Sequence, residues 1–398
     1  MSRRLRGFVP SWFFAPYAGS ADMDLYKRLL HAELDFDVVQ VRQGAKDPRV
    51  LGLRGAATFQ RFEVETDHRQ PRTRTVRDDF HRAVIGRFQA QPSGYDFLLS
   101  HSNEVPSHAA ALACKRLAPE LPWVAYFGDL VAKNPYVRHL PEYPLNDEDC
   151  QTEALTLEHA DLVICNNTYQ RDAMCSGALA RFADKVRVIP HCFEPALYPA
   201  APPPISGSGK FTFMHLGTLY QVKRRAEPVL QAVERLLSVY PSYAGRFEVI
   251  FYGGAVPAPD LQAWWSMRHR DHVRFEGAVP YLDSLGLMQQ AGALLLIDGM
   301  FTEAEDGVAA SPFLPGKLLD YLGARRPVLG VTMARGPSAD LLGALGHLHG
   351  DARPDKVAWL MKRCIDGRVS PDYAQLEPYT ARAVGKQMEA AIREVVKA

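Results

Sequence analysis

The stretch SPFLPGKLLDYLGARRPVLGV, residues 311–331, predicts a short helix that passes directly into an apolar strand. The helix opens at Pro315-Gly316 and ends before Pro327, and the strand follows at 327–331. Its first turn holds Lys317, where the helix macrodipole is already positive and a cation costs roughly 0.3–1 kcal/mol. An anionic ligand at the helix start would turn this cost into a gain.

The same alternation of apolar strands and helices extends over the rest of the chain and predicts parallel sheets covered by helices. The sequence favours two doubly wound domains, 1–198 and 210–377, joined by the Pro/Ala/Gly/Ser-rich linker 199–209, with a last helix over 378–398. Residues 50–80 fit either a strand pair or an insertion. Strands are expected at about 5–9, 37–41, 96–100, 122–127, 161–165, 186–189, 211–216, 247–252, 272–275, 293–297 and 327–331.

Composition narrows the class of protein. The chain has 398 residues, of which 47% are hydrophobic and 23% charged, as in a globular enzyme. Its formal net charge of +1 gives no field that would attract nucleic acid. Six cysteines without paired short spacing indicate reduced thiols and a cytoplasmic protein. Arg3, Arg4 and Arg6 fit either a solvated start or contact with an anionic membrane at its inner face.

A second basic helix start lies in HLGTLYQVKRRAEPVLQAV, residues 215–233. Gly217 follows a predicted strand, and Lys223 and Arg224 precede a predicted helix. Ligands of open α/β sheets bind at the carboxyl ends of strands, so the two basic sites together suggest a diphosphate. Asp320 would then accept hydrogen bonds from ribose hydroxyls. Alternatively, Lys317 pairs with Asp320 three residues on, and Lys223 and Arg224 belong to an exposed charge run.

These motifs resemble the retaining glycosyltransferases of the GT-B fold, in the group called glycosyltransferase family 4. VRVIPHCFEPALYP (186–199), GTLYQVKRRAEPVLQAV (217–233) and LPGKLLDYLGARRPVLG (314–330) carry the resemblance. It implies two Rossmann-like domains facing a central cleft. It also implies retaining transfer of a hexosyl group from a UDP- or GDP-sugar to a carbohydrate or lipid-linked glycan, in polysaccharide biosynthesis.

The resemblance also implies roles for individual residues. Lys223 and Arg224 would hold the donor diphosphate and assist its departure, and Asp320 would hold the ribose. This chain departs from the family at two positions. Thr218 stands where many members have an arginine after the glycine of the basic loop. Pro312, beside Ser311, stands where many members have a glutamate eight residues before the ribose-binding acid. The remaining donor-binding candidates are Gly217, Thr218, Gly253, Val279, Pro280, Tyr281, Ser311, Pro315, Lys317 and Tyr321.

Candidates for the acceptor lie in the first domain. The aromatic loop VPSWFFAPYAGSADMDLYKRL (9–29) holds Tyr17 and Gly19 where the family has a glycine-rich loop. Its aromatic residues would stack on an acceptor or form core. Asp129 would act as a base or orient the acceptor hydroxyl, or else cap a helix. His101 and His191 are acceptor-binding candidates, with a structural role as the alternative.

The cleft-forming segments contain no Asp-x-Asp metal motif, so we expect metal-independent transfer without a cofactor. Two other functions stay open: a nucleotide-sugar 2-epimerase, and a non-catalytic partner that binds sugar nucleotides. A dinucleotide-dependent oxidoreductase is disfavoured because no G-x-G-x-x-G follows the first strand.

Overall fold

The computed structural model describes residues 3–67, 73–102, 104–139, 146–198 and 209–397. The chain divides into two compact units. The first unit comprises Met1–Cys192 and Tyr379–Ala398, and the second comprises Phe193–Pro378. The change of unit after Cys192 precedes the boundary expected at residue 198. The expected linker 199–209 lies outside the described residues except for Gly209.

The first unit is built on a seven-stranded parallel sheet with the order β3-β2-β1-β4-β5-β6-β7. The apolar runs that predict the strands are the buried ones, and the alternation with helices forces right-handed parallel crossovers. The strands are β1 (Arg6–Pro10), β2 (Asp35–Val41), β3 (Thr58–Val64), β4 (Phe97–Ser102), β5 (Trp123–Phe127), β6 (Leu162–Cys165) and β7 (Val186–Val188).

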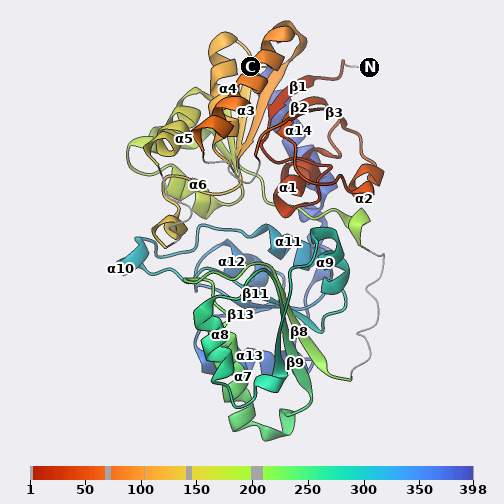
Figure 1. Cartoon of the computed structure of the whole chain (residues 1–398), viewed down its shortest axis with the longest axis vertical. Coiled ribbons are helices and arrows are strands. Elements are labelled where there is room, and N and C mark those ends of the chain that lie inside the picture. Colours follow the sequence, from red (N-terminus) through yellow and green to blue (C-terminus); the bar gives the residue numbers. More distant parts are fainter. Residues whose placement is uncertain (1–2, 68–72, 103, 140–145, 199–208, 398) are drawn as a thin grey trace. The chain divides into compact units, whose positions relative to one another are not determined.

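Helices cover this sheet, and the C-terminal helix α14 packs against α1 (Figure 1). Gly385 of α14 lies at this contact, and a Cβ there would be 3.4 Å from the Arg28 carbonyl oxygen, an ordinary packing distance. Residues 50–80 hold the parallel edge strand β3 and the start of α3, so the expectation of a strand pair is wrong. The helices are α1 (Ser20–Leu29), α2 (Pro48–Gly52), α3 (Arg74–Ala90), α4 (Pro106–Leu117), α5 (Asp147–His159), α6 (Thr168–Met174) and α14 (Ala381–Lys397).

The second unit has a six-stranded parallel sheet with the order β10-β9-β8-β11-β12-β13. Its strands are β8 (Phe211–Leu216), β9 (Phe247–Tyr252), β10 (Val273–Glu276), β11 (Ala293–Ile297), β12 (Val328–Val331) and β13 (Leu348–Gly350). Its helices are α7 (Glu227–Val239), α8 (Ala258–Trp265), α9 (Tyr281–Met288), α10 (Glu303–Asp306), α11 (Gly316–Gly323), α12 (Pro337–Ala344) and α13 (Pro354–Ile365).

Both sheets are doubly wound, which confirms the predicted fold class. The direction of winding reverses between β1 and β4 in the first sheet and between β8 and β11 in the second. Ligands of such sheets bind beyond the carboxyl ends of the strands at this reversal. In the second unit, Gly217 follows β8 and Asp298 follows β11, so a glycine and a carboxylate lie at this reversal.

Candidate functional site

Lys317 lies directly against Gly217 in the second unit. A Cβ placed on Gly217 would come within 2.3 Å of the Lys317 Nζ atom. Gly217 also has φ +139°, a conformation that side chains other than glycine rarely adopt. The glycine therefore lets the ammonium of α11 reach the end of β8.

The Lys317 ammonium is buried without a hydrogen-bond partner among the described residues. Burial first, and the nearby charge of Arg224 second, lower its pKa to about 7, against an opposing effect of Asp298. His215 lies in the same surroundings, where burial and then the charges of Lys317 and Arg224 lower its pKa well below the usual value. Positive charge is therefore disfavoured at the end of β8 without a ligand, and a bound anion would stabilise the charged form of Lys317.

Lys223 and Arg224 are adjacent in sequence but have different surroundings. The Lys223 Nζ donates to Glu305 Oε2 at 2.8 Å and to Asp306 Oδ2 at 2.7 Å. Its charge is therefore already neutralised, which argues against the prediction that Lys223 holds the diphosphate. Arg224 carries the charge that acts on Lys317, and its guanidinium lies 4.8 Å from the centre of the Tyr220 ring.

The structure brings together Asp320 and Tyr281, two of the residues predicted to bind the donor. The Tyr281 hydroxyl donates to Asp320 Oδ1 at 3.0 Å, and Asp320 is only 4% exposed. Pro280 and Pro315 are the N-cap residues of α9 and α11, the helices that carry these two side chains. The contact of Asp320 with a ribose stays a prediction.

Tyr321 does not have the surroundings of a donor-binding residue. Its side chain is completely buried, and its hydroxyl accepts from the Leu216 N–H at 2.8 Å and faces the Leu216 carbonyl at 3.3 Å. These contacts argue against the expected role of Tyr321 in donor binding, which stays a prediction. Instead, Tyr321 fastens α11 to the last residue of β8, immediately before Gly217.

We expect the change Tyr321→Phe to lower the free energy of unfolding of the second unit by about 1–3 kcal/mol, because it leaves the buried Leu216 N–H without an acceptor. Hydrogen exchange of the amides in β8 measures this change. Unchanged exchange would show that the hydroxyl does not hold the strand end.

A shallow, open pocket lies at the carboxyl ends of β8, β9 and β10. Gly217 and Gly253 line it and touch, since a Cβ on Gly253 would lie 2.7 Å from the Gly217 carbonyl oxygen. Glycine-lined backbone suits a flat nucleobase, and the site for one is predicted here. The complete lining is Gly217, Leu219, Phe251, Tyr252, Gly253, Gly254, Ala255, Val256, Phe275 and Glu276.

The other predicted donor residues do not line this pocket. Thr218 and Pro280 are exposed and Val279 is half-buried, so backbone or side-chain contact with a ligand is open to them. Ser311 is 2% exposed and uses its Oγ to accept from the Phe313 N–H at 3.4 Å. Its hydroxyl therefore serves the local turn.

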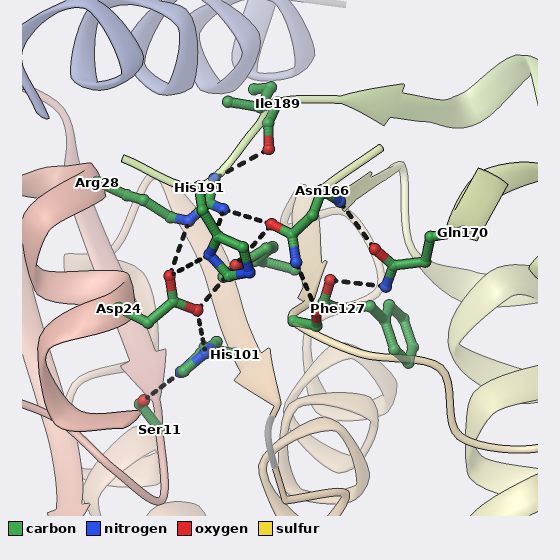
Figure 2. A network of polar contacts seen from close by, with 11 residues as sticks. Ser11, Asp24, Arg28, His101, Phe127, Asn166, Gln170, Ile189 and His191 are labelled. Carbon is green, nitrogen blue, oxygen red and sulfur yellow. Dashed lines mark hydrogen bonds and ion pairs between the residues drawn. The ribbon is translucent and has the colours of Figure 1, made fainter. Parts of the chain in front are cut away.

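A buried polar network surrounds Asp24 in the first unit (Figure 2). Its carboxylate lies 2.9 Å from His191 Nδ1 and 3.4 Å from His101 Nε2, and it accepts from the Tyr126 hydroxyl at 2.8 Å. The completely buried Arg28 donates to Asp24 at 3.3 Å, and also to the Asn166 side chain and the Ile189 carbonyl.

The Asp24 carboxylate is held in its charged form. Burial alone would raise its pKa, but the charges of His191 and Arg28 and the hydrogen bonds from both histidines hold that pKa well below the usual range. His101 is 1% exposed and His191 is 9% exposed. Their positions favour the structural alternative for both histidines. Sequence analysis missed Asp24 and Arg28, although their i, i+4 spacing on a predicted helix was the available signal.

The aromatic loop of the first unit is also mostly core. Tyr17 is 3% exposed, and its hydroxyl donates to Glu63 Oε1 at 2.9 Å. Burial and this hydrogen bond raise the pKa of Tyr17 to about 12. This burial argues against contact of Tyr17 with an acceptor, which stays a prediction. Gly19 is exposed and caps α1, where its N–H donates to Asp22 Oδ2, and Asp129 is exposed just after β5.

Two further findings concern metal ions and membranes. Within the described part of the chain, no cluster of three or more His, Cys, Asp or Glu residues could hold a metal ion, and no helix has the length and apolarity to cross a membrane. Arg3, Arg4 and Arg6 pair with Asp96, Asp35 and Asp37, respectively. The three arginine side chains that would contact an anionic membrane are therefore paired with carboxylates within the protein.

Comparison with solved structures identifies the fold. No family model and no curated protein sequence matches the chain. A sucrose-phosphate synthase from Thermosynechococcus elongatus is 15% identical with a TM-score of 0.62, and the match covers 99% of this chain and 95% of that one. An α,α-trehalose-phosphate synthase (UDP-forming) from Burkholderia vietnamiensis is 12% identical with a TM-score of 0.64, covering 98% and 100%.

A putative UDP-N-acetylglucosamine 2-epimerase from Listeria monocytogenes is 13% identical with a TM-score of 0.60, covering 98% and 96% of the two chains. The class that these matches define is a two-domain α/β protein with parallel, doubly wound sheets. More particularly, the chain has the GT-B fold, which confirms the fold that the resemblance in the sequence implied.

Proposed function

We propose that the protein is a glycosyltransferase that takes its sugar from a nucleotide-sugar donor bound in the second unit. The observation that carries the proposal is the buried Lys317 ammonium, without a hydrogen-bond partner among the described residues, at the start of α11 beside Gly217. A folded protein has no stability reason to keep such a charge, whereas a pyrophosphate would use it directly. In this proposal the base lies against the glycine-lined backbone next to Gly217.

In this proposal Lys317, Arg224 and the amino end of α11 stabilise the negative charge that develops on the departing diphosphate. Fixed cations at this place supply the charge that a divalent metal ion supplies in other transferases, so the proposed transfer is metal-independent. Retention of the anomeric configuration is proposed from the family resemblance, with the leaving phosphate assisting the acceptor hydroxyl on the same face of the sugar.

The proposed acceptor is a carbohydrate or lipid-linked glycan hydroxyl bound by the first unit, in synthesis of a bacterial glycan in the cytoplasm. Asp129 is proposed to orient the acceptor hydroxyl, whose proton goes to the leaving phosphate, because Asp129 is exposed and follows β5 at the carboxyl edge of the sheet. A direct membrane contact has no support from Arg3, Arg4 and Arg6, since each pairs with an aspartate.

The proposal is tested by thermal-shift titration of the full chain with UDP-, GDP-, ADP- and TDP-sugars. We expect one nucleotide to raise the melting temperature by several degrees, and the matching sugar nucleotide to release its diphosphate when an acceptor panel is added without metal. Absence of binding to all four nucleotides would overturn the proposal. Binding without transfer or slow hydrolysis would favour a non-catalytic partner.

A nucleotide-sugar 2-epimerase is the second candidate, because one structural match carries that description over nearly the whole chain. An epimerase would convert a UDP-sugar into its 2-epimer without any acceptor. Proton NMR of the sugar after incubation with the chain alone distinguishes the two reactions, since only the epimerase changes the configuration at C2.

A further inference from the structure

The backbone at Lys223 is unusual for a residue with a side chain. Lys223 has φ +66°, in the left-handed region, which costs a non-glycine residue about 1–3 kcal/mol. Its carbonyl oxygen accepts a 2.8 Å hydrogen bond from the N–H of Met300, which lies beyond β11. Such strain persists only where the surrounding contacts fix it.

Those contacts come from the segment that includes α10. The side chain of Asp306 is completely buried, and its Oδ2 accepts both the Lys223 ammonium at 2.7 Å and the Thr302 N–H at 2.7 Å. Glu305 adds a second carboxylate at 2.8 Å from the same ammonium, although its side chain is 67% exposed. Segment 300–306 is thus joined to the basic loop through both the backbone and the side chain of Lys223.

Arg224, the next residue, has backbone hydrogen bonds within the basic loop itself. Its carbonyl oxygen accepts from the Tyr220 N–H at 2.8 Å, and its own N–H donates to the Val222 carbonyl at 2.7 Å. The loop is therefore tightly folded around Lys223, and the guanidinium of Arg224 is held over the Tyr220 ring. The two neighbouring cations therefore differ in their surroundings. Lys223 is neutralised by two carboxylates, whereas the charge of Arg224 acts on Lys317.

We propose that Lys223 is a positioning residue: it clamps segment 300–306 onto the basic loop and so directs Arg224 towards the diphosphate, which Lys223 itself does not touch. This inference rests on the proposed function. The family resemblance instead implies that Lys223 holds the donor diphosphate directly. In the present inference Asp306 contributes to donor affinity, although a carboxylate by itself would repel a diphosphate.

The test is calorimetric titration of the full-length variants with UDP and with GDP. We expect Lys223→Met and Asp306→Asn each to weaken binding of the preferred nucleotide about 10-fold, and the double variant to be no weaker than either one, because all three remove the same ion pair. Lys223→Arg should restore most of the affinity. Arg235→Met, which removes an exposed charge from α7 of the same unit, is the matched control and should bind as the wild type does.

Direct contact between Lys223 and the diphosphate predicts the opposite result for Asp306→Asn, since removal of the competing carboxylate would leave binding unchanged or tighter. That outcome overturns the inference while the proposed function stands. A wild-type chain that binds none of UDP, GDP, ADP and TDP overturns both. Hydrogen exchange of the Met300 amide gives an independent reading without nucleotide: we expect faster exchange in Lys223→Met, and an unchanged rate would show that the ion pair does not hold the segment.

Discussion

The variant Lys317→Met is expected to lose nucleotide binding and to gain stability. Without the ammonium, the affinity for the preferred nucleoside diphosphate should fall by at least about 30-fold, since truncating one partner of a buried charge pair costs about 2–5 kcal/mol. Methionine fills a similar volume and removes a buried charge that has no partner among the described residues, so the free energy of unfolding should rise by about 1–2 kcal/mol. Calorimetric titration and urea unfolding measure the two effects.

The pH dependence of binding gives the same variant a second readout. The pKa of Lys317 is about 7 without ligand, and a bound diphosphate would raise it. Between these two values binding takes up a proton, so the affinity of the wild type should fall as the pH rises above 7. Titration at pH 8 in buffers of different ionisation enthalpy should reveal about one proton taken up by the wild type and none by Lys317→Met.

The effects of Lys317→Met on nucleotide affinity and on stability together distinguish a ligand-binding lysine from a structural one. A lysine needed for the fold would leave the variant less stable, and a lysine outside the site would leave affinity unchanged. Either result would contradict the assignment. Arg235→Met again serves as the control for loss of one positive charge from the second unit.

The sequence predicted the second unit well because its physical signals are local. Apolar runs bounded by turns located β8, β9 and β11 to the residue, and the misplaced charge at the start of α11 led to Lys317. The ion pairs of Lys223 were not predicted, because its partners Glu305 and Asp306 lie more than eighty residues away. No local pattern reveals which carboxylate a lysine will meet.

Tyr321 and Tyr17 show a similar limit. Each has a hydroxyl that suits a sugar ligand, but the fold uses Tyr321 to hold Leu216 and Tyr17 to hold Glu63. Whether a hydroxyl faces solvent or a distant backbone group depends on packing between elements, which periodicity does not encode. The edge strand β3 escaped prediction for a related reason: only one of its seven residues, Val64, is buried, so its apolar signal is weak.

Asp24→Ala is expected to have the largest effect on the stability of the first unit. The change leaves the Arg28 guanidinium completely buried without its counter-ion, which costs about 3–5 kcal/mol. Because the pKa of Asp24 is lowered in the folded state, its contribution is present above about pH 4, near the unfolded pKa, and is lost as the pH falls through the folded value. Hydrogen exchange of amides in β4 and β5 at pH 7 measures this loss in the first unit alone.

The double variant Asp24→Ala/Arg28→Met decides the cause. If the cost arises from an uncompensated buried charge, removal of that charge as well should recover much of the stability, although neither substitution restores a polar contact. Asp79→Ala is the matched control, since Asp79 pairs with the exposed Arg82 and should cost no more than about 1 kcal/mol. Recovery in the double variant would mean that the fold requires Asp24 as the counter-ion of Arg28. Equal loss in the single and double variants would instead give the Asp24 carboxylate a role of its own towards the two histidines.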